Sequence, residues 1–186
     1  MRLGRIGRNR SIYVLHRKAG MQYPDALDRT LVGTYPALAH VGGGYVWDAV
    51  LEYRVWCHPE DGAPMVEEGN DYYYSFATYQ EALDFSNGNA GTEEPLALVL
   101  QEEYIDEPEA GQYVHVKARR ITEWPVNFLS RPRRRPHTIP DFFAADAPPN
   151  RLDILRGSAS ADRKGGKQAG EPTDDVKEGG SSPGAS

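Results

Sequence analysis

The run VLEYRVWC, residues 50–57, alternates along its length between two sets of side chains. A period of two is typical of a β-strand, whose successive side chains point to opposite faces of a sheet. The two sets are Leu51, Tyr53, Val55 and Cys57 on one face and Glu52, Arg54 and Trp56 on the other. Since the first set is apolar and the second carries charge, we expect a half-buried strand that ends at His58-Pro59.

A second strand and a helix are predicted next in the chain. Residues 72–76 (YYYSF) alternate in the same way, with three aromatic side chains on one face: Tyr72, Tyr74 and Phe76. Thr78 and Glu81 then have the spacing of a capping box, in which each side chain accepts a hydrogen bond from a backbone N–H of the first helical turn. The pattern predicts a short helix from Thr78 to Asn87-Gly88-Asn89, packed on the apolar face of the first strand.

The second half of the predicted domain contains a long hairpin. Residues 96–104 and 112–121 each alternate between two faces, and the acidic segment 105–111 between them is expected to form the turn. We therefore expect a two-layer α+β domain, with an antiparallel sheet of about four strands and one main helix. Trp124-Pro125-Val126 and Phe128-Leu129 are expected to close one sheet edge. Residues 138–143 are expected to form a short terminal helix with Pro140 in its first turn.

The distribution of charge locates the folded part of the chain. Residues 1–45 carry seven bases and two acids, residues 46–156 carry ten and twenty, and residues 157–186 carry four and five. All three tryptophans and all five phenylalanines lie in the middle part. We therefore expect one domain over residues 46–156. Residues 157–186 contain seven glycines, five serines and no aromatic residue, which predicts a disordered tail.

The first 45 residues allow several interpretations. Six basic residues precede the first acid, Asp25: Arg2, Arg5, Arg8, Arg10, Arg17 and Lys18. This composition resembles a transit peptide or a nucleic-acid arm. The two alternatives that we favour are a disordered extension and a start codon assigned too far upstream, with translation beginning at Met21 or near Val46. In either case Gly42-Gly43-Gly44 is expected to be the hinge into the fold.

Composition excludes several classes of protein. The chain of 186 residues has a net charge of -6, one cysteine and no apolar run near the roughly 18 residues that a membrane span requires. An internal disulfide framework is excluded, because it needs at least a second cysteine. We expect a cytoplasmic protein that does not enter a membrane.

Cys57 is a candidate nucleophile, with His58, His115 or His137 as its base, and the same residues could be metal ligands. The paired spacings typical of metal sites are absent, so no metal is expected. The structural alternative is that Cys57, at the end of a strand on its apolar face, is a small buried hydrophobe.

One basic cluster stands in the acidic domain: Arg131, Arg133, Arg134 and Arg135, with Lys117, Arg119 and Arg120 upstream. Clustered arginines can hold an anionic ligand, or they can pair with acids of the same chain or of a symmetry mate. Twenty acids against ten bases over residues 46–156 argue against a nucleic-acid partner, which requires a broad positive surface.

Four further side chains are expected on the sheet face opposite the main helix: Trp56, Tyr73, Trp124 and His115. Aromatic rings on such a face could line a ligand pocket. The alternatives are a cover formed by residues 124–143 or a second subunit.

Three stretches resemble a group of short proteobacterial proteins that often carry the label of GNAT-type (GCN5-related) acetyltransferases. They are residues 53–60 (YRVWCHPE), the block from Asp71 to Leu83, and residues 113–124 (YVHVKARRITEW), and the resemblance covers about Trp47 to Phe143. It implies transfer of an acetyl group from acetyl-CoA to an amine. No residue role is carried over from the family; if the activity holds, we expect the arginines at 131–135 to bind the cofactor phosphates and Glu123 or His115 to act as base. The chain lacks the Gln/Arg-x-x-Gly-x-Gly/Ala loop of that family. The nearest stretch, Gly42-Gly43-Gly44, has Ala39 where Gln or Arg is required, and it is expected to lead into a strand and not into a helix.

The residues themselves favour a non-catalytic α+β binding or interaction domain without a cofactor. We expect it to self-associate as a homodimer or to meet a protein partner, and to bind an anionic ligand at the arginine cluster. An acetyltransferase that uses acetyl-CoA is the alternative, on the resemblance described above.

Overall fold

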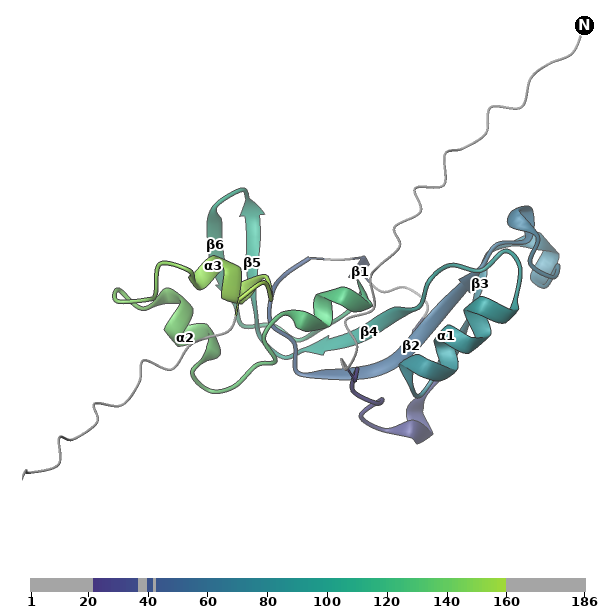
Figure 1. Ribbon diagram of the computed structural model, residues 1–186, viewed down its shortest axis with the longest axis horizontal. Helices are drawn as coiled ribbons and strands as arrows, with labels where there is room; N and C mark the ends of the chain where they lie inside the picture. The colour runs from purple at the N-terminus through teal and green to yellow at the C-terminus, as the bar shows by residue number, and fades with distance from the viewer. Residues whose placement is uncertain (1–21, 37–39, 42, 160–186) are drawn as a thin grey trace, which may run out of the picture.

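The computed structural model describes residues 22–36, 40–41 and 43–159 (Figure 1). They form a five-stranded sheet of order β1-β7-β4-β2-β3 and a two-stranded sheet of β5 and β6. Only the pair of β1 with β7 is parallel among these described strands. The chain is therefore α+β, as predicted.

The bounds of the elements are as follows. The strands are β1 His40–Val41, β2 Ala49–Cys57, β3 Tyr72–Phe76, β4 Leu96–Gln101, β5 Tyr104–Glu109, β6 Gln112–Val116 and β7 Arg120–Pro125. The helices are α1 Tyr79–Gly88, α2 Thr138–Phe143 and α3 Arg151–Leu155, with 3-10 turns η1 Arg29–Leu31, η2 Pro59–Asp61, η3 Glu67–Gly69 and η4 Val126–Ser130. None of these described helices is long and apolar enough to cross a membrane.

Strand β2 is buried on both faces, whereas the sequence predicted burial of one. A β-bulge interrupts its pairing with β4 between Val50 and Glu52. The intervening Leu51 therefore turns away from Tyr53 and packs with apolar side chains of the other face: Ala49, Leu98 and Leu100. The prediction that Leu51 and Tyr53 share a face is wrong, because the bulge shifts the alternation by one residue.

Helix α1 begins at the predicted capping box. The Thr78 hydroxyl accepts a hydrogen bond from the Glu81 N–H at 3.2 Å, and the Glu81 carboxylate accepts one from the Thr78 N–H at 3.0 Å. The helix ends at Gly88, also as predicted. It covers the sheet face that carries Tyr53, where Ala82 is fully buried.

The predicted hairpin is divided between the two sheets. Strand β4 pairs with β7 in the larger sheet, whereas β5 pairs with β6 in the smaller one, with the turn at Ala110-Gly111. The expectation of an acidic turn over residues 105–111 is wrong. The reason is Ile105, which is fully buried with Val46 against α2 and α3 and so holds the acidic segment extended.

Trp124 lies in the interior strand β7 and not at a sheet edge as predicted. Its ring is buried in the main core between the large sheet and α1, and the turn η4 after β7 adds Phe128 and Leu129 to the same core. The short helix predicted over residues 138–143 is present as α2.

The fold begins before the predicted boundary at residue 46. Ala26 is buried and its N–H donates to the Ala77 carbonyl at 2.8 Å, while the Leu27 N–H donates to the Val50 carbonyl at 2.8 Å. Residues 22–36 are therefore not a disordered extension, because their backbone is bonded to the sheet. The predictions for residues 1–21, for Gly42 and for the tail beyond Ala159 lie outside the described residues.

Gly91 provides a test of the packing between loops. It has φ +70°, and a Cβ at this position would lie 2.2 Å from the backbone nitrogen of Ala63. We expect Gly91→Ala to lower the free energy of unfolding by at least about 2 kcal/mol, because a left-handed non-glycine residue is strained and the clash is with backbone. Urea denaturation measures the change.

Gly88→Ala is the matched control. Gly88 lies in α1 and no atom lies within 4 Å of its Cβ position. This substitution should leave stability unchanged or raise it by up to about 1 kcal/mol, because alanine is the better helix former. Equal losses at both positions would show that the close contact at Gly91 is unimportant.

Candidate functional site

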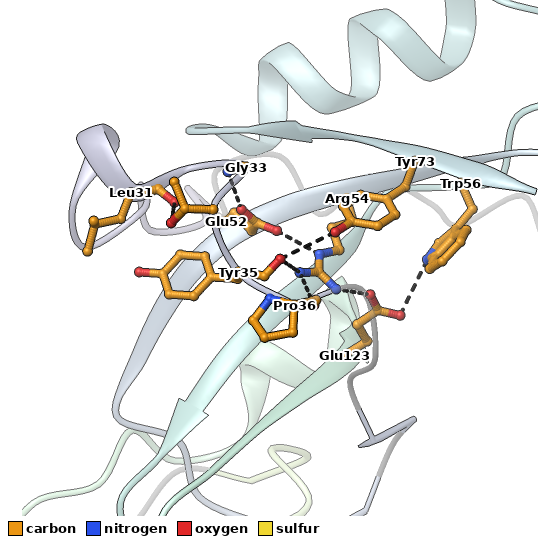
Figure 2. Close-up of polar contacts among 10 residues, drawn as sticks. Leu31, Gly33, Tyr35, Pro36, Glu52, Arg54, Trp56, Tyr73 and Glu123 are labelled. Atoms are coloured by element: carbon orange, nitrogen blue, oxygen red, sulfur yellow. Dashed lines mark hydrogen bonds and ion pairs between the residues drawn. The ribbon is translucent and has the colours of Figure 1, made fainter. Parts of the chain in front are cut away.

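A buried guanidinium organises one face of the large sheet (Figure 2). Arg54, on β2, donates from Nε to Glu52 Oε1 at 2.6 Å and from Nη1 to Glu123 Oε1 at 2.8 Å. Glu52 and Arg54 are completely buried, and Glu123 is 4% exposed. Because Glu123 lies on β7, the ion pair reaches across the intervening strand β4.

Residues 33–36 cover this network from the solvent side. The Gly33 N–H donates to Glu52 Oε2 at 2.7 Å, and Arg54 Nη2 donates to the Pro36 carbonyl at 2.8 Å. Figure 2 shows this segment passing over the carboxylate and the guanidinium. Both oxygens of Glu52 are therefore bonded, one to β2 and one to the covering segment.

Trp56 and Tyr73, two of the predicted pocket residues, belong to the same network. Their ring centroids are 4.9 Å apart, and the Arg54 guanidinium carbon lies 4.5 Å from the Tyr73 centroid. Trp56 Nε1 donates to Glu123 Oε2 at 3.4 Å. Burial by itself lowers the pKa of Arg54, but hydrogen bonds to Glu123 and Glu52 outweigh it, so the pKa is raised and the guanidinium stays charged.

The polar groups of this network already have partners within the chain. Both oxygens of Glu123, a predicted catalytic base, are bonded to Arg54 and Trp56. The face that was expected to meet a ligand, a second subunit or residues 124–143 is covered by the chain's own residues 33–36. Sequence reasoning missed Glu52 and Arg54, although their spacing of two places opposite charges on one face of a strand.

The expected aromatic pocket is not formed. Trp124 lies in the main core, on the face opposite Trp56 and Tyr73. His115 lies on β6, at the opposite end of the molecule from β3 (Figure 1), with Nε2 2.6 Å from Glu103 Oε2. The pocket prediction fails because Trp124 lies on the other face of the larger sheet and His115 belongs to the smaller sheet.

Cys57 lies at the end of β2 and is 1% exposed. Burial raises the pKa of its thiol, which disfavours the thiolate that a nucleophile requires. The side chain borders a cavity of about 80 Å³ whose lining includes Tyr72 and Phe85. Over the described residues, no group of three or more His, Cys, Asp and Glu side chains could hold a metal ion.

Two of the predicted anion-binding arginines, Arg133 and Arg134, contact Asp48. Arg133 Nε donates to the Asp48 carbonyl at 2.8 Å, and Arg134 Nε donates to the Asp48 carboxylate at 2.7 Å. The side chain of Arg135 is exposed. The backbone of this loop is also held, since the Arg134 N–H donates to the Trp47 carbonyl at 2.7 Å. Pairing with the chain's own acid, an alternative considered above, is therefore observed for Arg134.

Arg131 is placed differently, and it approaches the same residue, Gly44, as Arg120 of β7. Arg131 Nη1 donates to the Gly44 carbonyl at 2.7 Å. A Cβ on Gly44 would lie 2.3 Å from Arg120 Nη2, which shows how closely the second guanidinium approaches the same residue. Two cationic groups from different parts of the chain therefore converge on Gly44.

Aromatic rings hold both guanidinium groups. Arg120 lies over the Tyr104 ring at 3.6 Å and donates from Nε to Gln101 Oε1 at 2.6 Å. Arg131 lies 3.7 Å from the Phe128 centroid, with two further rings within about 5 Å: Tyr45 and Trp124. Trp124 Nε1 donates to the Gly43 carbonyl at 3.2 Å, so this predicted ligand-binding residue positions the same loop.

The backbone next to Gly44 is strained at Val46. Gly43, Gly44 and Val46 all have positive φ, of 87°, 65° and 75°. Val46 is β-branched and fully buried, and such a conformation costs about 1–3 kcal/mol. The surrounding contacts maintain it, because Gln101 Nε2 donates to the Val46 carbonyl at 2.6 Å and the Tyr45 N–H donates to the Ile105 carbonyl at 2.7 Å.

Neither guanidinium has a carboxylate partner in the part of the chain that the structure describes. Arg120 Nη2 is buried without a hydrogen-bond partner there. Burial lowers the pKa of Arg131. Among the described residues, these two arginines therefore offer positive charge at a defined position, and Arg120 also offers a donor without a partner.

Comparison of the chain with protein-family models, curated proteins and solved structures finds no match. The resemblance to GNAT-type acetyltransferases therefore stays a prediction.

The contribution of the buried Arg54 ion pairs to stability can be tested by replacing Arg54 with a neutral residue. Arg54→Gln leaves Glu52 and Glu123 facing each other without a counter-charge, so we expect a loss of about 3–5 kcal/mol in unfolding free energy. Arg119→Gln is the control, because its pair with Glu102 at 3.6 Å is exposed on both sides and contributes at most about 1 kcal/mol. Comparable losses in urea denaturation would contradict a structural role for Arg54.

His58 predicts a pH dependence of stability. Its Nδ1 lies 3.0 Å from Asp71 Oδ1, and its Nε2 lies 3.1 Å from Glu93 Oε1 without hydrogen-bond alignment. Burial lowers the pKa of His58, but the hydrogen bond and charge of Asp71, together with Glu93, raise it above the ordinary value. The stabilising contribution should be fully present below about pH 6.5, the pKa of an unfolded histidine, and lost as pH rises through the folded-state pKa.

Unfolding free energies measured from pH 5.5 to pH 9 check this expectation. His58→Gln should remove the decline in stability that the wild-type chain shows as the pH rises, because glutamine does not titrate. His137→Gln, which removes an exposed histidine, is the control and should retain it. A decline that persists in His58→Gln would assign it to other groups.

Proposed function

We propose that this domain is a non-catalytic binding module that holds a small oxyanion, such as a phosphate or carboxylate group, between Arg120 and Arg131 at Gly44. One observation carries the proposal: two guanidinium groups approach the same backbone position, and neither has a carboxylate partner in the described chain. The arginines at 131–135 were expected to bind an anion. The proposed site uses one of them, Arg131, together with Arg120.

The other inward-facing arginines of the domain show why this pair is unusual. Arg54 contacts two carboxylates, and Arg134 contacts one. A buried donor left without an acceptor costs about 1–3 kcal/mol, and more when it is charged. An oxyanion would supply the acceptor that Arg120 Nη2 lacks, and guanidinium groups bind such anions through paired N–H donors.

The proposal is non-catalytic because two candidate reactive groups, Cys57 and Glu123, lie elsewhere. Cys57 is buried at the far end of β2, and Glu123 faces the opposite side of the sheet from Trp124 and Arg131. The Gly43-Gly44 segment leads towards β2 and not into a helix N-terminus, so it lacks the aligned amides of a pyrophosphate loop. Acetyl-CoA binding is therefore tested as one arm of the experiment below.

Ligand-induced thermal stabilisation tests the site. The full chain is titrated with inorganic phosphate, pyrophosphate, CoA and acetyl-CoA at constant ionic strength. A ligand that binds only the folded state adds RT ln(1 + [L]/Kd), or about 2.7 kcal/mol at one hundred times Kd. We expect a saturable rise in melting temperature with at least one of these oxyanions, and its loss in Arg120→Gln.

Arg135→Gln is the matched control, since it removes the same charge from an exposed side chain and should retain the rise. Arg131→Lys should weaken binding, because lysine keeps the charge but lacks the planar pair of donors. Equal responses in Arg120→Gln and the wild-type chain, or no response to any of the four compounds, would refute the proposed site.

A further inference from the structure

The unpaired edge of strand β3 is a surface that the proposed anion site does not use. In the larger sheet β3 is the outermost strand next to β2 (Figure 1). Within residues 22–36, 40–41 and 43–159, no other strand pairs with its second edge. An edge of this kind presents backbone N–H and C=O groups that can pair with another strand.

The edges of β1 and β5 carry features that discourage pairing. Strand β1 has two residues. Strand β5 contains Pro108 and three acids, and the pairing of β5 with β6 is interrupted by a register shift between Asp106 and Glu109. Short strands, prolines, charges and bulges are the usual means of blocking an edge. Strand β3 has none of them, since its sequence is YYYSF and its register with β2 is continuous.

We propose that β3 pairs with β3 of a second copy of this chain, in an antiparallel arrangement about a twofold axis at Tyr74. Charge favours β3 as the place where two copies meet: residues 46–156 carry twenty acids against ten bases, so two copies repel each other over most of their other surfaces. The strand Tyr72–Phe76 has no charged residue. It is an edge at which two acidic copies can approach without placing like charges opposite each other.

The side chains of β3 are complementary to themselves in this arrangement. Antiparallel pairing about Tyr74 places Tyr72 of one copy opposite Phe76 of the other and the two Tyr74 side chains opposite each other. All three lie on the face of α1, where Tyr74 is 47% exposed although it contacts Phe85 at 4.9 Å. Aromatic cross-strand pairs stabilise antiparallel sheets, so the second copy would cover an aromatic surface.

An apolar loop extends this surface beyond the strand. The Tyr72 hydroxyl donates to the Pro64 carbonyl at 2.9 Å, which places Met65 and Val66 near the start of β3. Met65 is 80% exposed and Val66 is 40% exposed. The end of β3 in the second copy would face this loop, so burial would include side chains as well as backbone.

Sedimentation velocity of the full chain, over a range of concentrations, tests the interface. We expect a concentration-dependent species of twice the 20.7 kDa chain mass, and Tyr74→Lys should shift the population to monomer. Val114→Lys is the matched control, because Val114 is an equally exposed apolar side chain, at 44%, on the edge strand β6. It should leave the dimer intact.

Hydrogen exchange provides a second measurement that needs no substitution. Amides of residues 72–76 should exchange more slowly at high protein concentration than at low concentration, whereas those of residues 112–116 should not change. A monomer at every concentration would overturn the proposal. So would a dimer that dissociates in Val114→Lys but persists in Tyr74→Lys, or exchange in residues 72–76 that is independent of concentration.

Discussion

The fold depends on the neutralisation of a completely buried guanidinium. Arg54 lies between Glu52 of the same strand and Glu123 of β7, with 2.6 Å and 2.8 Å contacts. A buried charge is tolerated only when partners and hydrogen bonds compensate for the loss of water. The backbone of residues 33–36 completes that compensation, so one residue couples β2, β7 and the N-terminal segment.

This constraint also limits where function can lie. The sheet face with Trp56, Tyr73 and Glu123 is filled by the chain itself, and its polar groups are directed at one another. The opposite face holds α1 and the main core. The region where the large sheet meets β5 and β6 is not filled in this way. There the backbone is strained at Val46, and Arg120 and Arg131 have no carboxylate partner among the described residues.

Arg54 and Arg120 show how context separates a structural arginine from a candidate binding residue. Both stack on a tyrosine ring, at 4.5 Å and 3.6 Å. Arg54 has two carboxylates, whereas Arg120 has the neutral Gln101 and a buried donor without a described partner. The proposed oxyanion would give Arg120 what Glu52 and Glu123 give Arg54. Strand β3, at the other end of the molecule, is independent of that site.

The sequence by itself determined the α+β class, the strands at residues 50–57 and 72–76, and the capped helix that begins at Thr78, because these depend on side-chain periodicity and on contacts between residues close in the chain. Only the tertiary structure decided the bulge that reverses Leu51, the division of the hairpin at Ile105 and the docking of residues 22–36. It also decided that Arg120 and Arg131 approach the same residue, Gly44. These features arise from contacts between residues far apart in sequence, and local periodicity carries no information about such contacts.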